Sequence, residues 1–188
     1  MKQTTKNLAL AAMCMAAGLA LPFLTGQIPK IGNMLLPMHL PVLLCGLLCG
    51  WQYGAAVGFV LPLLRYAVFG MPPIFPIGVS MAFELAAYGL IAGFLYQHSR
   101  WQCIVSLYRS LLAAMLGGRI VWGVVRLLLT GIAGEAFTLH MFLAGALLTA
   151  IPGIILQLVF IPAIMVALDR TGMVHFRREH PKTVSEQP

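Results

Sequence analysis

Apolar residues run along this chain in long stretches, each ended by a short segment rich in proline, glycine or polar residues. A helix needs about 20 mostly apolar residues to cross the hydrocarbon core of a bilayer. The pattern therefore predicts six membrane-spanning helices. The second of these is short unless part of the preceding segment belongs to it. Their expected ranges are 7–24, 41–50, 55–69, 77–96, 104–129 and 139–168.

The segments between these helices contain strong turn signals. Residues 25–33 form a turn-rich first loop. The run MLLPMHLP, at 34–41, has two prolines four positions apart, which predicts a broken or re-entrant helix entrance. WQYG, at 51–54, is expected to be a tight interfacial turn, because Trp and Tyr favour the membrane–water boundary. GMPPIFP, at 70–76, contains three prolines and predicts a stiff loop.

Composition agrees with a membrane location. The chain has 188 residues, of which 60% are hydrophobic and only 9% are charged, and its mean hydropathy is +0.91. Soluble domains carry about 25% charged residues. We therefore expect an all-α integral membrane protein, a bundle of about six transmembrane helices. Residues 1–169 would form the transmembrane domain and 170–188 a basic cytoplasmic tail. No G-x-x-x-x-G-K-[ST] phosphate loop is present, so any ATP would be used by partner subunits.

The net charge of +7 reports topology, not nucleic-acid binding. Cytoplasmic segments of membrane proteins carry an excess of Lys and Arg. If both termini lie in the cytoplasm, Lys30 is the only basic residue of the loops and tails that lies on the outer side. The cytoplasmic side then holds Lys2, Lys6, Arg100, Arg109, Arg170, Arg177, Arg178 and Lys182.

Four charged residues lie inside the predicted spans: Arg65, Glu84, Arg119 and Arg126. A charge at the centre of a bilayer costs about 2.5–3.5 kcal/mol on insertion scales, so it must face a polar cavity or a partner. Counting along the helices places all four in the outer half or near the midplane. Their formal sum of +2 favours an anionic ligand group. Two alternatives remain open: Arg126 extends to the outer interface without binding a ligand, and Arg65 forms a structural ion pair with Glu84.

Further polar and aromatic residues are candidates for the same site. Trp122 shares one helix face with Arg119 and Arg126, and His39 and Asn33 lie near the expected pocket mouth. We therefore take as candidate substrate-binding residues Asn33, His39, Arg65, Glu84, Arg119, Trp122 and Arg126. Weaker candidates are Tyr66, Tyr88 and Gln157, with Gln157 expected deep on the cytoplasmic side.

Small residues recur every four positions on the first helix, at Ala12, Ala16 and Ala20. Such spacing lets a second helix backbone approach closely. The face could pack against the protein's own helices or dock a partner membrane subunit.

Enzymatic and metal-binding motifs are missing from the sequence. There is no H-E-x-x-H, no G-x-S-x-G and no paired-carboxylate arrangement. Cys45 and Cys49 lack the His or Asp companions of a metal site. We expect no catalytic residue, no metal and no cofactor in this chain.

The motifs MLLPMHLPVLLCGLLCGWQYG, LLRYAVFGMPPIFP and MAFELAAYGLIAGFLY, with the spaced alanines, resemble the substrate-binding S components of energy-coupling factor (ECF) vitamin transporters. The resemblance extends over residues 7–169. It implies high-affinity vitamin binding near the extracellular side, closed by loops 25–33 and 70–76. It also implies docking of Ala12 and Ala16 on a transmembrane coupling subunit, with two ATPase subunits supplying energy.

The excess of buried arginine favours an anionic vitamin, with pantothenate as the first candidate and folate or flavin phosphate behind it. Two other readings compete: a solitary small transporter or channel that works as an oligomer on an ion gradient, and a membrane enzyme using Arg65, Glu84 and His39. We expect the chain to be a multi-pass protein of the prokaryotic plasma membrane.

Overall fold

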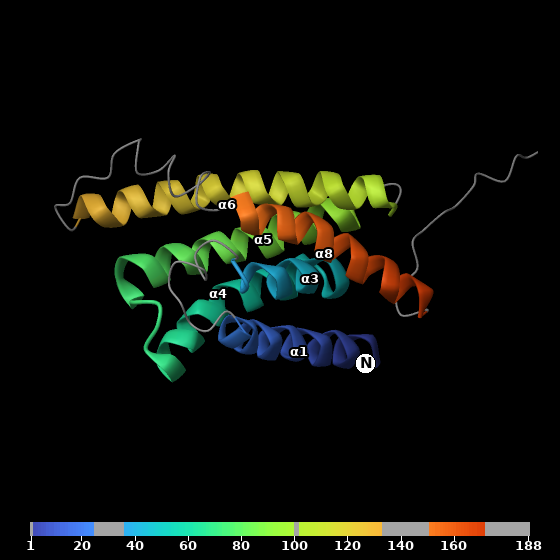
Figure 1. The fold of residues 1–188 in the computed structure, drawn as a ribbon, viewed down its shortest axis with the longest axis horizontal. Coiled ribbons are helices and arrows are strands. Elements are labelled where there is room, and N and C mark those ends of the chain that lie inside the picture. Colours follow the sequence, from blue (N-terminus) through green and yellow to red (C-terminus); the bar gives the residue numbers. More distant parts are fainter. Residues whose placement is uncertain (1, 25–35, 100–101, 133–150, 172–188) are drawn as a thin grey trace, which may run out of the picture.

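The computed structural model describes residues 2–24, 36–99, 102–132 and 151–171. Within these residues every regular element is helical, and the helices lie side by side as one elongated bundle (Figure 1). Five are long and apolar enough to cross a membrane, and α3 is shorter. The prediction of an all-α membrane bundle is confirmed. The elements are α1 (Lys2–Leu24), α3 (His39–Cys49), α4 (Trp51–Phe69), η1 (Ile74–Gly78), α5 (Val79–Gln97), α6 (Ile104–Ile132) and α8 (Ile151–Arg170).

The two ends of the bundle differ in which connections they hold. One end carries the start of α1, the turn between α3 and α4, the end of α5, the start of α6 and the end of α8 (Figure 1). We call this the inner end. It gathers four of the basic residues assigned to the cytoplasm, namely Lys2, Lys6, Arg109 and Arg170. The other basic residues of that prediction lie outside the described part of the chain.

The turn between α3 and α4 differs from the prediction. WQYG is helical from Trp51 onward, so the expected turn at 51–54 is wrong. The chain turns at Gly50 alone, which has φ +106° and donates its N–H to the carbonyl oxygen of Gly46 at 3.1 Å. A side chain at that φ is strained, whereas glycine adopts it readily, so one residue suffices to reverse the chain.

The two proline-rich segments compare differently with the prediction, and only the first begins its helix earlier than expected. The segment MLLPMHLP enters α3 at His39, with Pro41 in the first helical turn, where proline is tolerated. GMPPIFP is not regular helix as far as Phe75, whose φ of −114° and ψ of 136° are extended and place a kink inside η1 (Ile74–Gly78). Regular helix therefore follows close to the expected start at 77. At 1.5 Å per residue α3 is about 16 Å long, so it starts midway through the bundle and His39 lies deep.

Glycines hold α3, α4 and α5 together at backbone contact. A Cβ atom on Gly46 would lie 2.5 Å from the carbonyl oxygen of Gly89, and one on Gly93 would lie 2.6 Å from the carbonyl oxygen of Gly46. Gly54 of α4 lies in the same contact. Small residues allow helices in a membrane to approach this closely. The three helices therefore form one block that fixes His39 on α3 relative to Glu84 on α5.

Two apolar clusters fill the described interior. One joins α3, α5, α6 and α8 around Leu43, Leu107, Leu111 and Ile161. The other joins α1, α3, α4 and α5, and its buried members are Ala11, Met38, Val42, Cys45, Cys49, Val57, Leu61 and Leu85.

Candidate functional site

The buried face of α6 changes character along its length. Toward the inner end it is apolar, with Leu107, Leu111 and Ala114 fully buried. Beyond Gly118 the same face continues with residues that carry charge or hydrogen-bonding groups. These are Arg119, Trp122 and Arg126, all half-buried, and the buried Thr130. The outer half of α6 therefore presents polar groups to the bundle interior.

Helix α5 repeats this change on the opposite wall. Its buried residues with polar groups are Ser80, Glu84 and Tyr88, all toward the outer end, whereas Ala92 is buried nearer the inner end. Ser80 donates its hydroxyl to the carbonyl oxygen of Ile77 at 2.8 Å, so its polar group is satisfied locally. Glu84 accepts a hydrogen bond from the hydroxyl of Tyr88, four residues further along α5, and its other contacts come from neighbouring helices.

A buried ionic layer forms where α3, α5 and α6 meet. Nη1 of Arg119 lies 3.0 Å from Oε1 of Glu84, and Nε2 of His39 lies 3.6 Å from the same oxygen. The side chains of Glu84 and His39 are only 2% exposed, and that of Arg119 is 11% exposed. The Arg119–Glu84 contact is an ion pair by distance, without the alignment of a hydrogen bond.

Aromatic packing fixes the geometry of this layer. The ring of Tyr88 lies edge-on to the imidazole of His39, with centroids 5.0 Å apart. Tyr88 also packs against Gly118 of α6, where an added Cβ would lie 3.0 Å from the tyrosine ring. Glycine at 118 therefore lets α6 approach α5 closely enough for Arg119 to reach Glu84.

Several buried nitrogen atoms in this half of the molecule have no hydrogen-bond partner among the described residues. They include Nε and Nη2 of Arg119, Nε of Arg126 and Nη1 of Arg65. Nε2 of Gln157 belongs to the same group. Buried polar groups are normally satisfied, so these donors indicate that the region needs acceptors from elsewhere.

Gln157 lies on α8 with its side chain 1% exposed. It is about 20 Å from the inner end of that helix at 1.5 Å per residue. Its position deep toward the cytoplasmic side stays a prediction.

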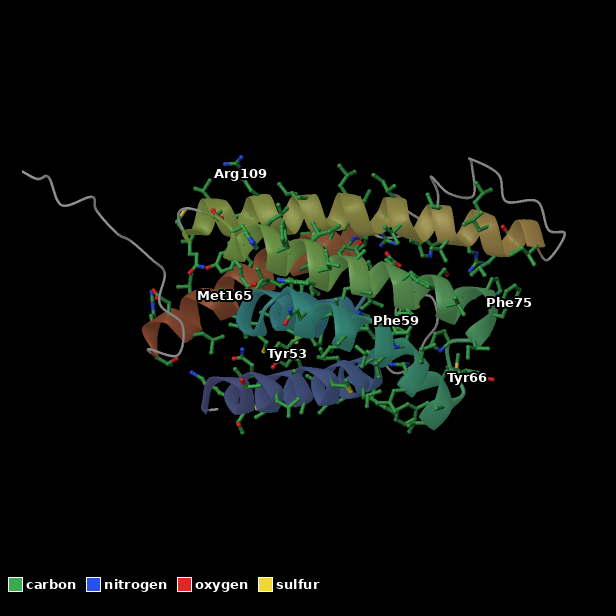
Figure 2. The ribbon with its side chains drawn as sticks, turned by 180° about the vertical axis from the view of Figure 1, so that it is seen from behind. Tyr53, Phe59, Tyr66, Phe75, Arg109 and Met165 are labelled. Atoms are coloured by element: carbon green, nitrogen blue, oxygen red, sulfur yellow. The ribbon has the colours of Figure 1, made fainter. Side chains whose placement is uncertain are left out.

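The structure also corrects the pairing considered for Glu84. An ion pair with Arg65 was one alternative, but within the described residues Glu84 contacts Arg119 and His39 instead. Arg65 is half-buried on α4. Tyr66 is exposed near the outer end (Figure 2). Asn33 lies outside the described residues.

The spaced alanines of α1 lie on an open surface. Ala12, Ala16 and Ala20 are exposed, while α1 packs against its neighbours through other residues. Gly18 contacts Leu61 of α4, and Ala11 belongs to the apolar cluster of α1, α3, α4 and α5. The structure therefore does not pack this face against the protein's own described helices, which was one of the two interpretations.

Tyr88 is the residue that sequence reasoning undervalued most. It was a weak candidate, yet it is 1% exposed and contacts both His39 and α6. Its position four residues after Glu84 was an available signal, because residues at that spacing share a helix face.

These observations define a class: a helical membrane protein whose outer half holds a buried ionic layer of His39, Glu84 and Arg119, with two further arginines, Arg65 and Arg126, partly buried in the same half. Such an interior is suited to holding a polar solute within the bundle. The chain matches the family described as "ECF transporter, substrate-specific component" over residues 6–166. It therefore belongs to that family, and is a multi-pass cell-membrane protein of a transport system. No curated protein and no solved structure matches the chain.

Proposed function

We propose that this chain is the high-affinity substrate-binding subunit of an ATP-driven ECF importer for an anionic vitamin or related micronutrient. The observation that carries the anionic preference is the charge balance of the outer half. Arg65, Arg119 and Arg126 lie there with unpartnered buried nitrogens, and Glu84 is the one acid among the described residues of that half, since Asp169 lies at the inner end of α8. An anion supplies the missing negative charge and the missing acceptors.

Pantothenate is the first candidate substrate. It is small and carries one carboxylate, together with hydroxyl and amide oxygens that accept hydrogen bonds. A cationic vitamin such as thiamine would need a free carboxylate, and Glu84 is already engaged by Arg119 at 3.0 Å. Folate and flavin phosphate are further anionic candidates.

Energy would come from a transmembrane coupling subunit and two ATPase subunits. The exposed face formed by Ala12, Ala16 and Ala20 supports this assignment, because a stripe of small residues on a membrane helix favours close docking of another helix. The chain itself would use no ATP.

Uptake in cells tests the proposal. Cells lacking their own pantothenate uptake would express the chain alone, the chain with its coupling and ATPase subunits, or the same set with an ATPase unable to hydrolyse ATP. We expect uptake of labelled pantothenate, or of another anionic micronutrient, only in the second case. Uptake by the chain alone that follows an ion gradient would contradict the proposal and favour a solitary transporter.

A further inference from the structure

The guanidinium of Arg119 is only partly used by the protein. A guanidinium is planar and carries five N–H donors, and its Nε and one terminal nitrogen form an edge that matches the two oxygens of an oxyanion. Glu84 contacts the group through Nη1. The opposite edge, formed by Nε and Nη2, is buried and has no partner among the described residues.

The position of Arg119 is fixed from several sides. Glu84 holds Nη1, and the fit of Tyr88 against Gly118 sets the separation of α5 and α6. His39, at 3.6 Å from Glu84, packs on the ring of Tyr88. A guanidinium held in this way needs little reorganisation before it binds a ligand, which favours affinity.

Two more buried nitrogens without a partner among the described residues need acceptors. They are Nε2 of Gln157 on α8 and Nε of Arg126, two helical turns further out on α6. Oε1 of Glu84 and the ring nitrogens of His39 also lack a hydrogen bond, but Oε1 already faces Nη1 of Arg119 and Nε2 of His39. A ligand that brought mainly donors would leave these nitrogens and the edge of Arg119 unsatisfied. An oxyanion with further acceptor oxygens would satisfy them.

We propose that the Nε–Nη2 edge of Arg119 binds an oxyanion of the transported ligand, carboxylate or phosphate, through two parallel N–H···O hydrogen bonds, with Glu84 as the positioning residue. This inference rests on the proposed function and adds the contact that recognises the substrate. Bidentate contacts of this kind are a property of arginine, and the point charge of lysine does not reproduce them.

The first step of the test identifies the ligand chemistry with the wild-type full-length chain in detergent. Thermal stabilisation is measured with pairs that differ in the oxyanion: pantothenate and pantothenol, biotin and its amide, flavin mononucleotide and riboflavin, pyridoxal phosphate and pyridoxal. We expect one oxyanion to stabilise the chain and its neutral counterpart to bind at least about tenfold more weakly. The first two pairs report a carboxylate, and the last two report a phosphate.

The second step assigns the contact to Arg119. The dissociation constant for that oxyanion is compared in the wild type, Arg119→Lys and the control Arg109→Lys. Arg109 is exposed on α6 and points away from the bundle (Figure 2). We expect Arg119→Lys or Arg119→Ala to weaken oxyanion binding at least about tenfold, and Arg109→Lys to leave it unchanged. Should Arg119→Lys fail to fold, the double variant Glu84→Gln/Arg119→Gln, which buries no charge at these positions, takes its place with the same expected loss.

Three outcomes overturn the inference. Oxyanion binding of wild-type strength in a folded Arg119 variant would mean that the edge is satisfied by the protein itself. Stabilisation only by neutral or cationic micronutrients would refute the inference and the anionic preference while leaving a micronutrient-binding subunit in place. Stabilisation by no micronutrient at all would refute the proposed function together with the inference.

Discussion

The coupling between Glu84 and Arg119 gives a stability prediction that the structure makes quantitative. Replacing either residue alone with methionine, which is apolar and of similar length, leaves the other charge buried without its partner. Replacing both removes the two charges together. We therefore expect Glu84→Met and Arg119→Met each to destabilise the fold more than the double variant does.

The magnitude follows from the 3.0 Å separation of Nη1 and Oε1. Coulomb's law with an effective dielectric constant of about 20 gives an attraction of about 5–6 kcal/mol at that distance. Removing one partner of a buried ion pair typically costs about 3–5 kcal/mol, whereas replacing both with apolar residues is often neutral. Each single variant should thus lose about 3–5 kcal/mol, and the double variant clearly less than either.

Denaturant unfolding of the four proteins in the same detergent measures this cycle, with Arg109→Met as a control for removing an exposed arginine from α6. The control should change stability little, because surface substitutions are usually within about 0.5 kcal/mol. Strictly additive losses, with the double variant as unstable as the sum of the single variants, would show that the two residues do not stabilise each other and would refute the pairing.

Two further predictions concern helix packing and partner docking. Gly93→Ala should destabilise the fold by about 1–3 kcal/mol in a thermal unfolding assay, because its new Cβ would lie 2.6 Å from the carbonyl oxygen of Gly46. The matched control Gly131→Ala has nothing within 4 Å of its new Cβ, so it should be neutral or stabilising in the same assay. Equal effects of the two substitutions would contradict the close packing of α3 and α5. Ala16→Trp should abolish uptake by the complete transporter while ligand binding by the isolated chain persists, because Ala16 is exposed. Ala11→Trp, at a residue only 5% exposed, should instead impair folding and binding together. Loss of ligand binding in Ala16→Trp would place that face inside the protein.

The helices were predictable because their signals are local. Hydrophobic runs of sufficient length gave the positions of α1, α4, α5 and α6 to within a few residues, since a bilayer demands such runs. The four-residue spacing of Ala12 and Ala16 had two interpretations, an internal packing face or an outward docking face, and both residues are exposed. The short α3 was anticipated, because its apolar segment is bounded by Pro41 and Gly50.

The turn at Gly50 shows where local signals mislead. Trp51 and Tyr53 resemble interfacial residues, but a single glycine with positive φ reverses the chain, so α4 can begin at Trp51. A preference for an interface does not prevent an aromatic residue from starting a helix. The turn was therefore placed one to four residues too late.

The partner of Glu84 was not predictable, since it depends on contacts between helices. The charges themselves stood out in the sequence, but the partner considered for Glu84 was Arg65, not Arg119. The choice between them is made by the approach of α5 and α6, which the packing of Tyr88 on Gly118 permits. Hydrophobic patterns contain no information about such a contact between two residues thirty positions apart.

The central claim is that this chain captures an anionic micronutrient, and mass spectrometry of the small molecules released from it tests this most directly. The full-length chain would be purified in detergent from cells grown in rich medium, denatured, and its released small molecules compared with those from the Arg119→Ala variant prepared identically. We predict one carboxylated or phosphorylated micronutrient, at near-stoichiometric amount in the wild type and strongly reduced in the variant. A neutral or cationic compound retained equally by both proteins would contradict the claim.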